Sequence, residues 1–193
     1  MPPIHPTRRR ALLRAAGALA LGRAALAQTP DTVFWAAAKQ PGTVLLMRHA
    51  QTEPGIGDPP GLRLGDCSSQ RNLSEAGRIQ ARAVGERFAA HAVAVAEVRT
   101  SAWCRCVDTA QLAFGRVQVW SPLNSFFNGQ GDGESGATAV LAAARSWRGP
   151  GPLVLVTHQV NISRYTGEFT AMGELLAVRH EGGRLRLLAR LPA

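Results

Sequence analysis

Two apolar runs constrain the fold of this 193-residue chain more than any other feature of its sequence. Val44–Met47 and Pro152–Thr157 consist almost entirely of aliphatic residues, without polar residues alternating between them. A strand with this pattern is buried on both faces, as happens when helices cover both sides of a parallel sheet. The two runs therefore predict an α/β fold with a central sheet.

Helix and strand signals alternate along the rest of the chain. Ser74 is a favourable N-cap for a helix with apolar residues at helical spacing, namely Ile79, Ala83, Val84 and Phe88. Further strands are predicted at 93–99 and 117–120, helices at 102–114 and 137–147, loops at 54–66 and 128–136, and a β-hairpin at 175–178 and 184–191. This order predicts a three-layer α/β/α sandwich whose sheet is mostly parallel with an antiparallel edge.

Residues 1–27 have the character of an export signal. Arg9-Arg10-x-Leu-Leu-Arg14 resembles a twin-arginine signal, and Ala25-Leu26-Ala27 forms a small-x-small cleavage site. A surface helix or a membrane anchor fits less well, because the apolar run is short and interrupted by arginines. Cleavage leaves residues 28–193, a length that suits a single domain. We therefore expect a periplasmic or otherwise exported protein that contacts the membrane only through the uncleaved signal.

Much of the positive charge resides in that signal. The formal net charge is +9, and residues 1–27 hold five arginines and no acid, so the rest of the chain has a charge near +4. The remaining arginines are scattered, and Lys39 is the only lysine. A chain without a dense basic block is a poor candidate for binding nucleic acid.

The three cysteines, Cys67, Cys104 and Cys106, fit one disulfide and one free thiol in an exported protein. The Cys104-Arg105-Cys106 spacing differs from that of redox and haem-attachment motifs. No set of four zinc ligands can be assembled from the sequence, so we expect no metal. The sequence predicts a bond from Cys67 to Cys104 or Cys106 and leaves the choice between them open.

Basic side chains stand where three of the predicted strands end. Arg48 and His49 directly follow the first apolar run. Arg105 lies in the first turn of the helix after the second strand, and His158 follows the late apolar run. Each residue alone has an ordinary structural alternative: a solvent-facing charge, a buried structural histidine, an Arg105–Asp108 pair or a helix cap. Because ligands bind beyond the carboxyl ends of parallel strands, the convergence of all four indicates a site.

Two arginines and two histidines at one sheet edge suit a phosphoryl group. Guanidinium groups form bidentate hydrogen bonds with phosphoryl oxygens, and a helix N-terminus near Arg105 adds backbone donors. Neighbouring cations also disfavour protonation of a histidine, which keeps one ring nitrogen free to attack phosphorus. Phosphoryl transfer requires mainly positioning and charge stabilisation from the protein.

Four motifs along residues 43 to about 165 resemble those of the histidine phosphatase (phosphoglycerate mutase-like) superfamily, in a short form without a large helical insert. Arg48-His49-Ala50 is similar to its Arg-His-Gly signature, and residues 71–81 resemble its Leu-Thr-x-x-Gly-x-x-Gln-Ala helix start. Residues 101–110 resemble Ser-x-x-x-Arg-x-x-x-Thr-Ala, and Thr157-His158 resembles the late strand–histidine element.

The resemblance implies a role for each matching residue. His49 would be the nucleophile that becomes phosphohistidine, and His158 the second histidine of the pocket. Arg48 and Arg105 would grip the phosphoryl oxygens, with His158 completing the phosphate-binding set. The family needs neither a metal nor an organic cofactor, so we expect no cofactor.

The sequence departs from the family pattern in two places. Ala50 replaces the usual glycine, which is tolerable if the backbone there is not left-handed. The usual proton donor is also missing: Gln159 follows His158 where some members have Asp, and residues 121–127 lack a carboxylate. The substitute donors are the loop acids Glu53, Asp132 and Glu134.

These features predict an exported, cofactor-independent phosphatase that hydrolyses phosphomonoesters or related phosphoryl compounds through a phosphohistidine on His49. A weak proton donor favours low-pKa leaving groups such as phosphoramidates, acyl phosphates and aryl phosphates. The expected partner is a small-molecule or envelope-linked phosphorylated substrate. The alternative is a non-catalytic phosphate-binding module on the same fold, and the missing donor is what favours it.

Overall fold

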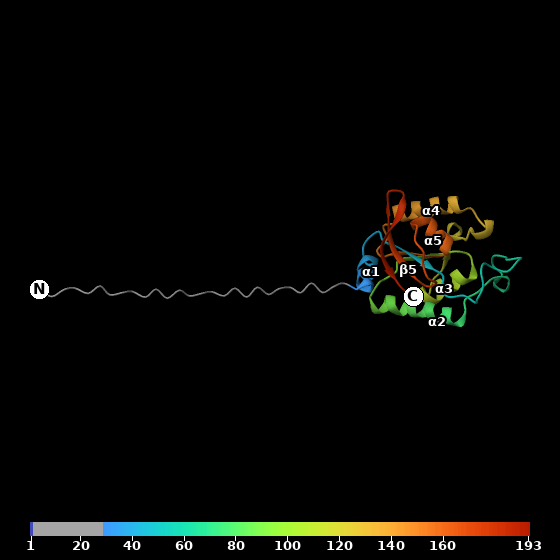
Figure 1. The fold of residues 1–193 in the computed structure, drawn as a ribbon, viewed down its shortest axis with the longest axis horizontal. Coiled ribbons are helices and arrows are strands. Elements are labelled where there is room, and N and C mark those ends of the chain that lie inside the picture. The colour runs from blue at the N-terminus through green and yellow to red at the C-terminus, as the bar shows by residue number, and fades with distance from the viewer. Residues whose placement is uncertain (2–28) are drawn as a thin grey trace.

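The computed structural model describes Met1 and residues 29–193, so the predicted export signal lies outside the described residues. A six-stranded sheet with the order β3-β2-β4-β1-β5-β6 forms the middle layer (Figure 1). The strands are β1 (Val44–Arg48), β2 (Glu97–Thr100), β3 (Gln118–Val119), β4 (Leu153–Thr157), β5 (Leu175–Glu181) and β6 (Arg184–Leu191). β1 to β4 are parallel, and β5 and β6 add an antiparallel edge. The predicted α/β fold is therefore confirmed.

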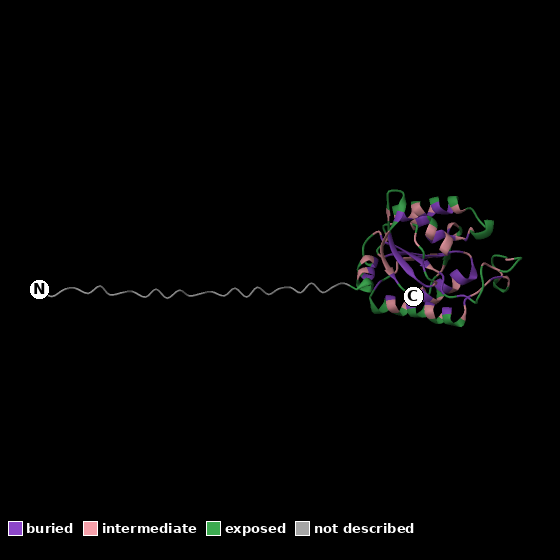
Figure 2. Cartoon of the chain, viewed as in Figure 1, coloured by how far each residue is buried: buried purple, intermediate pink, exposed green. Residues whose placement is uncertain are grey.

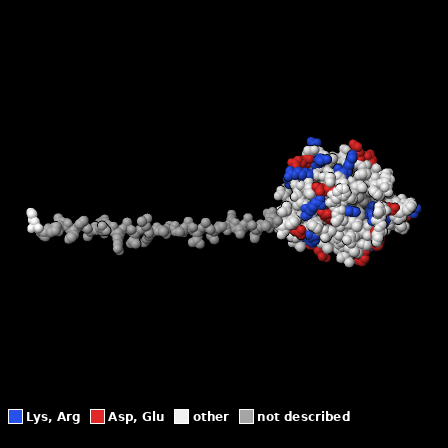
Figure 3. Space-filling model, in the orientation of Figure 1, with Lys and Arg blue, Asp and Glu red and all other residues white. Residues whose placement is uncertain are grey.

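Helices cover both faces of this sheet. α1 (Pro30–Ala38), α2 (Glu75–Ala90) and α3 (Cys104–Phe114) pack on one face, and α4 (Gly133–Ser146) and α5 (Gln159–Thr166) on the other. Single 3₁₀ turns occur at Cys67–Ser69, Ser121–Leu123 and Phe127–Gly129. No helix in the described part of the chain is both long and apolar enough to cross a membrane. On the face seen in Figure 3, basic and acidic side chains lie interspersed.

The alternation of side chains along β1 explains its continuous apolar run. Leu45 and Met47 join the core under α1, α2 and α3, whereas Val44 and Leu46 join the core under α4 and α5. Successive strand residues point to opposite faces, so a strand covered on both sides needs apolar residues at every position. β4 follows the same rule, and both strands lie in the buried centre of the molecule (Figure 2).

The buried face of α2 differs from the predicted one. Ile79 is 60% exposed and Ala83 is exposed, whereas Gly77, Ala81, Val84 and Phe88 are buried. The cause is close backbone contact, because a Cβ on Gly77 would lie 1.9 Å from the carbonyl oxygen of Gln51. Glycine lets α2 approach the segment after β1, and this approach turns Ile79 to the outside.

Other boundaries also differ from the predicted ones. α4 begins at Gly133 instead of residue 137, because the Asp132 side chain accepts hydrogen bonds from the amides of Glu134 and Ser135. β2 begins only at Glu97. α1 has no predicted counterpart, although Thr29 caps it and Pro30 occupies its first turn.

Replacing Gly77 with Ala is expected to lower the free energy of unfolding by about 1–3 kcal/mol, because the methyl group forces α2 away from Gln51. At an open helical position a Gly→Ala change raises the free energy of unfolding by up to about 1 kcal/mol. A decrease for Gly77→Ala would therefore show that Gly77 is in close contact with Gln51. Denaturant unfolding measures it. Ala83→Gly, exposed on the same helix, is the control and should cost only about 1 kcal/mol. An unchanged or increased stability for Gly77→Ala would contradict the packing.

Candidate active site

A cavity of about 340 Å³ opens beyond the carboxyl ends of β1 and β4. The structure brings together there the four residues that the sequence singled out: Arg48, His49, Arg105 and His158 all line it. Arg48 ends β1 and His49 follows it, and His158 follows β4 in register with His49, since the His49 amide donates to the carbonyl of Thr157 at 3.0 Å. Arg105 reaches the cavity from the first turn of α3.

His49 is a buried, neutral imidazole with one free ring nitrogen. Its Nδ1 lies 2.9 Å from the carbonyl oxygen of Ala50, which only accepts hydrogen bonds, so Nδ1 carries the proton. Nε2 is then the unprotonated nitrogen. Burial lowers the pKa of His49 to about 3, and the charges of Arg105, Arg48 and Arg71 add to the effect. His49 is therefore unprotonated at Nε2 at neutral pH, as nucleophilic attack requires.

The Ala50 departure is accommodated by the backbone. Ala50 is fully buried and does not have a positive φ angle, so its methyl group causes no left-handed strain. Its amide donates to Oγ1 of Thr109 on α3 at 3.0 Å. The residue after the histidine thus links β1 to the helix that carries Arg105.

His158 is buried beside His49, with the two ring centres 5.6 Å apart. Its Nδ1 lies 3.4 Å from Nη2 of Arg105, which only donates, so in the neutral ring Nε2 carries the proton toward Oγ of Ser101 at 2.8 Å. Burial lowers the pKa of His158, and His49 and Arg105 lower it further. Although His158 precedes α5, its side chain makes no capping bond.

A third arginine joins the two that the sequence predicted. Arg71, within the segment that resembles the family's helix start, also lines the cavity and donates through Nη1 to Thr52 Oγ1 and the carbonyl of Gly55. The buried Nε atoms of Arg48, Arg71 and Arg105 share one property, which is that none has an acceptor among the described residues. All three side chains line the cavity, and three cationic side chains on one cavity indicate a site for an oxyanion.

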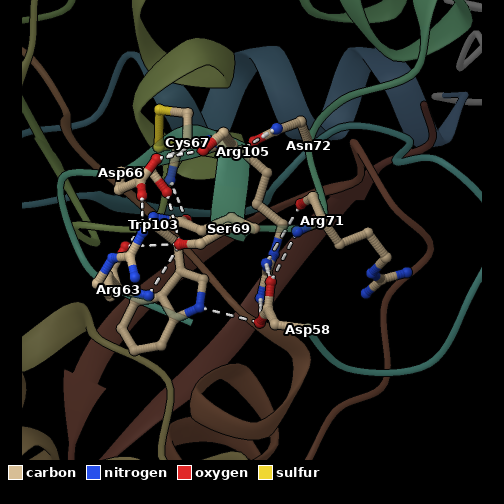
Figure 4. Close-up of a disulfide and its surroundings, with 12 residues drawn as sticks. Asp58, Arg63, Asp66, Cys67, Ser69, Arg71, Asn72, Trp103 and Arg105 are labelled. Carbon is tan, nitrogen blue, oxygen red and sulfur yellow. Dashed lines mark hydrogen bonds and ion pairs between the residues drawn. A yellow bond between two sulfur atoms is a disulfide. The ribbon is translucent and has the colours of Figure 1, made fainter. Parts of the chain in front are cut away.

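Asp58 is the main residue that the sequence prediction missed. Its side chain is 2% exposed, and it lines the cavity from the loop after β1 (Figure 4). Asp58 Oδ1 accepts from Arg105 Nη1 at 2.6 Å, and Oδ2 accepts from Arg105 Nη2 at 3.1 Å and from Trp103 Nε1 at 3.0 Å. The amide of Arg71 also donates to Oδ1, at 3.1 Å. Arg105 therefore pairs with Asp58, and the Arg105–Asp108 alternative is not found.

These contacts identify Asp58 as an ionised carboxylate. Burial by itself raises the pKa of Asp58, but hydrogen bonds and charge from Arg105, with the donors of Arg71 and Trp103, outweigh burial and bring the pKa below 3.8. All four of its contacts come from donors, so the carboxyl proton of a neutral Asp58 would lack an acceptor here. The residue fixes the guanidinium of Arg105 rather than offering a proton.

A disulfide joins the Asp58 loop to the start of α3. Cys67 pairs with Cys104, one of the two predicted pairings, directly before Arg105 in the chain (Figure 4). The Cys104 amide also donates to Oε1 of Gln70 at 2.9 Å. Cys106 is a buried free thiol, and burial raises its pKa to about 12, so it stays protonated.

The three acids considered as proton donors do not line the cavity. Asp132 caps α4, and Glu134 is 85% exposed and 3.5 Å from Arg164. Glu53 is exposed and lines a neighbouring hollow beside the loop after β1. Within residues 29–193 no group of three or more His, Cys, Asp or Glu side chains could hold a metal ion.

Residues 44–150 match the family model of the histidine phosphatase superfamily (branch 1), and the chain belongs to this family. A search of curated protein sequences finds no match. Among solved structures, SixA from Agrobacterium tumefaciens is 21% identical, with a TM-score of 0.55, covering 80% of this chain and 99% of that one. A mycobacterial glucosyl-3-phosphoglycerate phosphatase is 19% identical, with a TM-score of 0.53, covering 78% and 99%. At these identities the likeness shows the shared fold.

Asp58→Asn leaves the buried Arg105 charge without a counter-charge and is expected to lower the free energy of unfolding by about 3–5 kcal/mol at pH 7. The folded-state pKa of Asp58 lies below its usual value of 3.8. The Asp58–Arg105 pair therefore contributes its full stability above about pH 3.8, and this contribution is lost as the pH falls through the folded-state pKa of Asp58. The gap between wild type and variant should therefore narrow below about pH 4.

Denaturant unfolding between pH 3 and pH 7 measures this gap. Asp31→Asn, which breaks the exposed Asp31–Arg87 pair, is the control and should cost about 1 kcal/mol or less. A gap between wild type and Asp58→Asn that stays constant with pH would rule out an ionised Asp58 as its source.

The paired variant Cys67→Ala/Cys104→Ala is expected to lose about 2–4 kcal/mol of unfolding free energy, because the bond closes a sequence separation of 37 residues. A reductant should lower the stability of the wild type to that of the variant and leave the variant unchanged. If the reductant changes the free energy of unfolding of both proteins equally, the Cys67–Cys104 bond does not contribute to stability.

Proposed function

We propose that this protein is a phosphatase that works through a phosphohistidine on His49. The observation that carries the proposal is a neutral, buried histidine with a free Nε2 in a cavity lined by three arginines. Arg48, Arg71 and Arg105 bring three positive charges and Asp58 one negative charge, which leaves two positive charges for a phosphomonoester dianion. Guanidinium groups donate hydrogen bonds that match the oxygens of a phosphoryl group.

The proposed reaction has two displacements at phosphorus. Nε2 of His49 attacks, the bond from phosphorus to the leaving oxygen or nitrogen breaks, and the leaving group takes the electron pair. Water then attacks the phosphohistidine, the phosphorus–nitrogen bond breaks, and the electron pair returns to Nε2. The product leaves as dihydrogen phosphate, which keeps both protons of the water. Throughout, the arginines neutralise charge on the phosphoryl oxygens, and the Ala50 carbonyl holds the proton on Nδ1.

The ionised state of Asp58 favours leaving groups that depart without a strong acid. General acid catalysis typically contributes about 10²–10⁴-fold, which a poor leaving group would forfeit here. Phosphoramidates, acyl phosphates and aryl phosphates depend least on that proton. The SixA structures that share the fold include one described as a protein histidine phosphatase, and a phosphorylated histidine is a phosphoramidate.

The second candidate is a phosphate-binding module without turnover. The placement of Glu53, Asp132 and Glu134 away from the cavity favours it, because among the described residues the only carboxylate that lines the cavity is Asp58, which is paired with Arg105. The two candidates differ in one measurable property: a binding module retains inorganic phosphate but releases no product from an aryl phosphate.

We also propose export through the twin-arginine segment, with the folded domain acting outside the cytoplasm on a small-molecule or envelope-linked phosphorylated substrate. The Cys67–Cys104 disulfide supports this location, because structural disulfides persist in oxidising compartments.

His49→Ala is expected to abolish turnover of an aryl phosphate while retaining the arginines that bind inorganic phosphate. A chelator should be present during the assay, and the wild type quenched in denaturant should carry an acid-labile phosphoryl label that the variant lacks. His180→Ala, outside the cavity, is the control and should keep both turnover and label. Turnover of the aryl phosphate by the His49 variant at the wild-type rate would contradict the proposed phosphohistidine mechanism.

A further inference from the structure

The mouth of the cavity is apolar, in contrast to its cationic floor. Ile56, Phe127, Val160 and Met172 line it and come from four separate segments: the loop after β1, the turn after Phe126, the first turn of α5 and the loop before β5. Ile56 is 94% exposed and Phe127 is 38% exposed. Burial of such side chains against a ligand removes apolar surface from water and so favours binding.

The exposed position of Ile56 is imposed by its neighbours. Arg71 donates to the carbonyl of Gly55 at 2.7 Å on one side, and Asp58 is held by Arg105 on the other. Gly57, between them, has a φ of +71° and lies against the Phe127 ring, which a Cβ at that position would meet at 3.5 Å. Both ends of this short stretch are thus fixed, and Ile56 is exposed and lines the same cavity as Phe127.

Apart from the two histidines, three neutral polar side chains line the cavity, and two of them, Gln159 and Ser125, take part in internal hydrogen bonds, whereas Gln130 is exposed and has no side-chain hydrogen bond among the described residues. Gln159 Oε1 accepts from the amide and hydroxyl of Thr170, and its Nε2 donates to Ser163 Oγ and the carbonyl of Glu168. Ser125 Oγ accepts from the amide of Phe127. Gln159 therefore has no donor or acceptor left for the hydroxyl of a sugar or polyol, because recognition of a hydroxyl needs free donors and acceptors.

We propose that the site selects a phosphoryl group attached to a compact apolar body, such as one or two aromatic rings or a short alkyl chain. Ile56 and Phe127 are the specificity-determining residues, and the arginines take the phosphoryl end. A cavity of about 340 Å³ lies at the small end of ligand sites, which fits a small molecule of this kind. The inference rests on the proposed phosphatase function and extends it to a substrate class.

Phenyl phosphate and 2-naphthyl phosphate test this selectivity, since they share an aryl leaving oxygen of similar pKa and differ mainly in apolar area. We expect the wild type to favour 2-naphthyl phosphate by about tenfold in kcat/KM, the factor that corresponds to about 1.4 kcal/mol. The double variant Ile56→Ser/Phe127→Ser should reduce this preference to about twofold or less, chiefly through KM, because the reacting groups are untouched.

Ile79→Ser provides the matched control. Ile79 is also an exposed isoleucine, but it lies on α2 and does not line the cavity, so this variant should keep the wild-type preference. Equal kcat/KM values for the two esters in the wild type, or a preference that survives the double variant, would overturn the selectivity and leave the phosphatase function standing.

A binding measurement separates failure of the inference from failure of the proposed function. If the wild type turns over neither ester, the phosphatase proposal fails, and calorimetry with naphthylmethylphosphonate and methylphosphonate tests the selectivity alone. Tighter binding of the aromatic phosphonate to the wild type, lost in the double variant, supports the apolar mouth. Equal affinities for the two phosphonates overturn it.

Discussion

The parallel pairing of β1 with β4 is the constraint on which the rest of the site depends. Its register sets Arg48 opposite Thr157, so that the residues following the two strands, His49 and His158, emerge side by side. If the pairing of β1 with β4 shifted by one residue, every side chain of the shifted strand would move to the opposite face of the sheet. Here both faces are buried, and the two cores differ in the helices that fill them, so packing fixes the register and thereby the distance between the histidines.

The part of the site that the sequence predicted is the part that this pairing controls. Arg48, His49 and His158 directly follow apolar runs whose identity as central strands is unmistakable, and Arg105 sits at the start of the next helix. Asp58 lies in a loop of prolines and glycines, where no periodicity tells which side chain turns inward. Its inward position comes from donors on Trp103, Arg105 and Arg71, all distant in sequence.

In the fold too, the features with strong local sequence signals were predicted correctly, whereas those set by tertiary contacts were not. The mostly parallel sheet and its antiparallel edge follow from hydrophobic pattern and connection rules, and both are as predicted. The face that α2 buries follows instead from the closeness of Gly77 to Gln51, which places a glycine inside and Ile79 outside. A scale that ranks residues by hydrophobicity has no means of anticipating that glycine is the contact residue.

The phase of α3 has a consequence for how the chain acquires its covalent bond. Residues two positions apart in an α-helix, such as Cys104 and Cys106, lie about 200° apart around its axis. Once α3 has formed, Cys104 therefore faces Cys67 while Cys106 faces the core. Before α3 forms, both thiols have comparable access to Cys67. Oxidation that follows helix formation therefore yields one product, whereas oxidation of an extended chain yields a mixture that includes a cross-link to an inward-facing residue. Formation of the Cys67–Cys104 bond thus depends on whether α3 forms before oxidation as well as on the distance between the thiols.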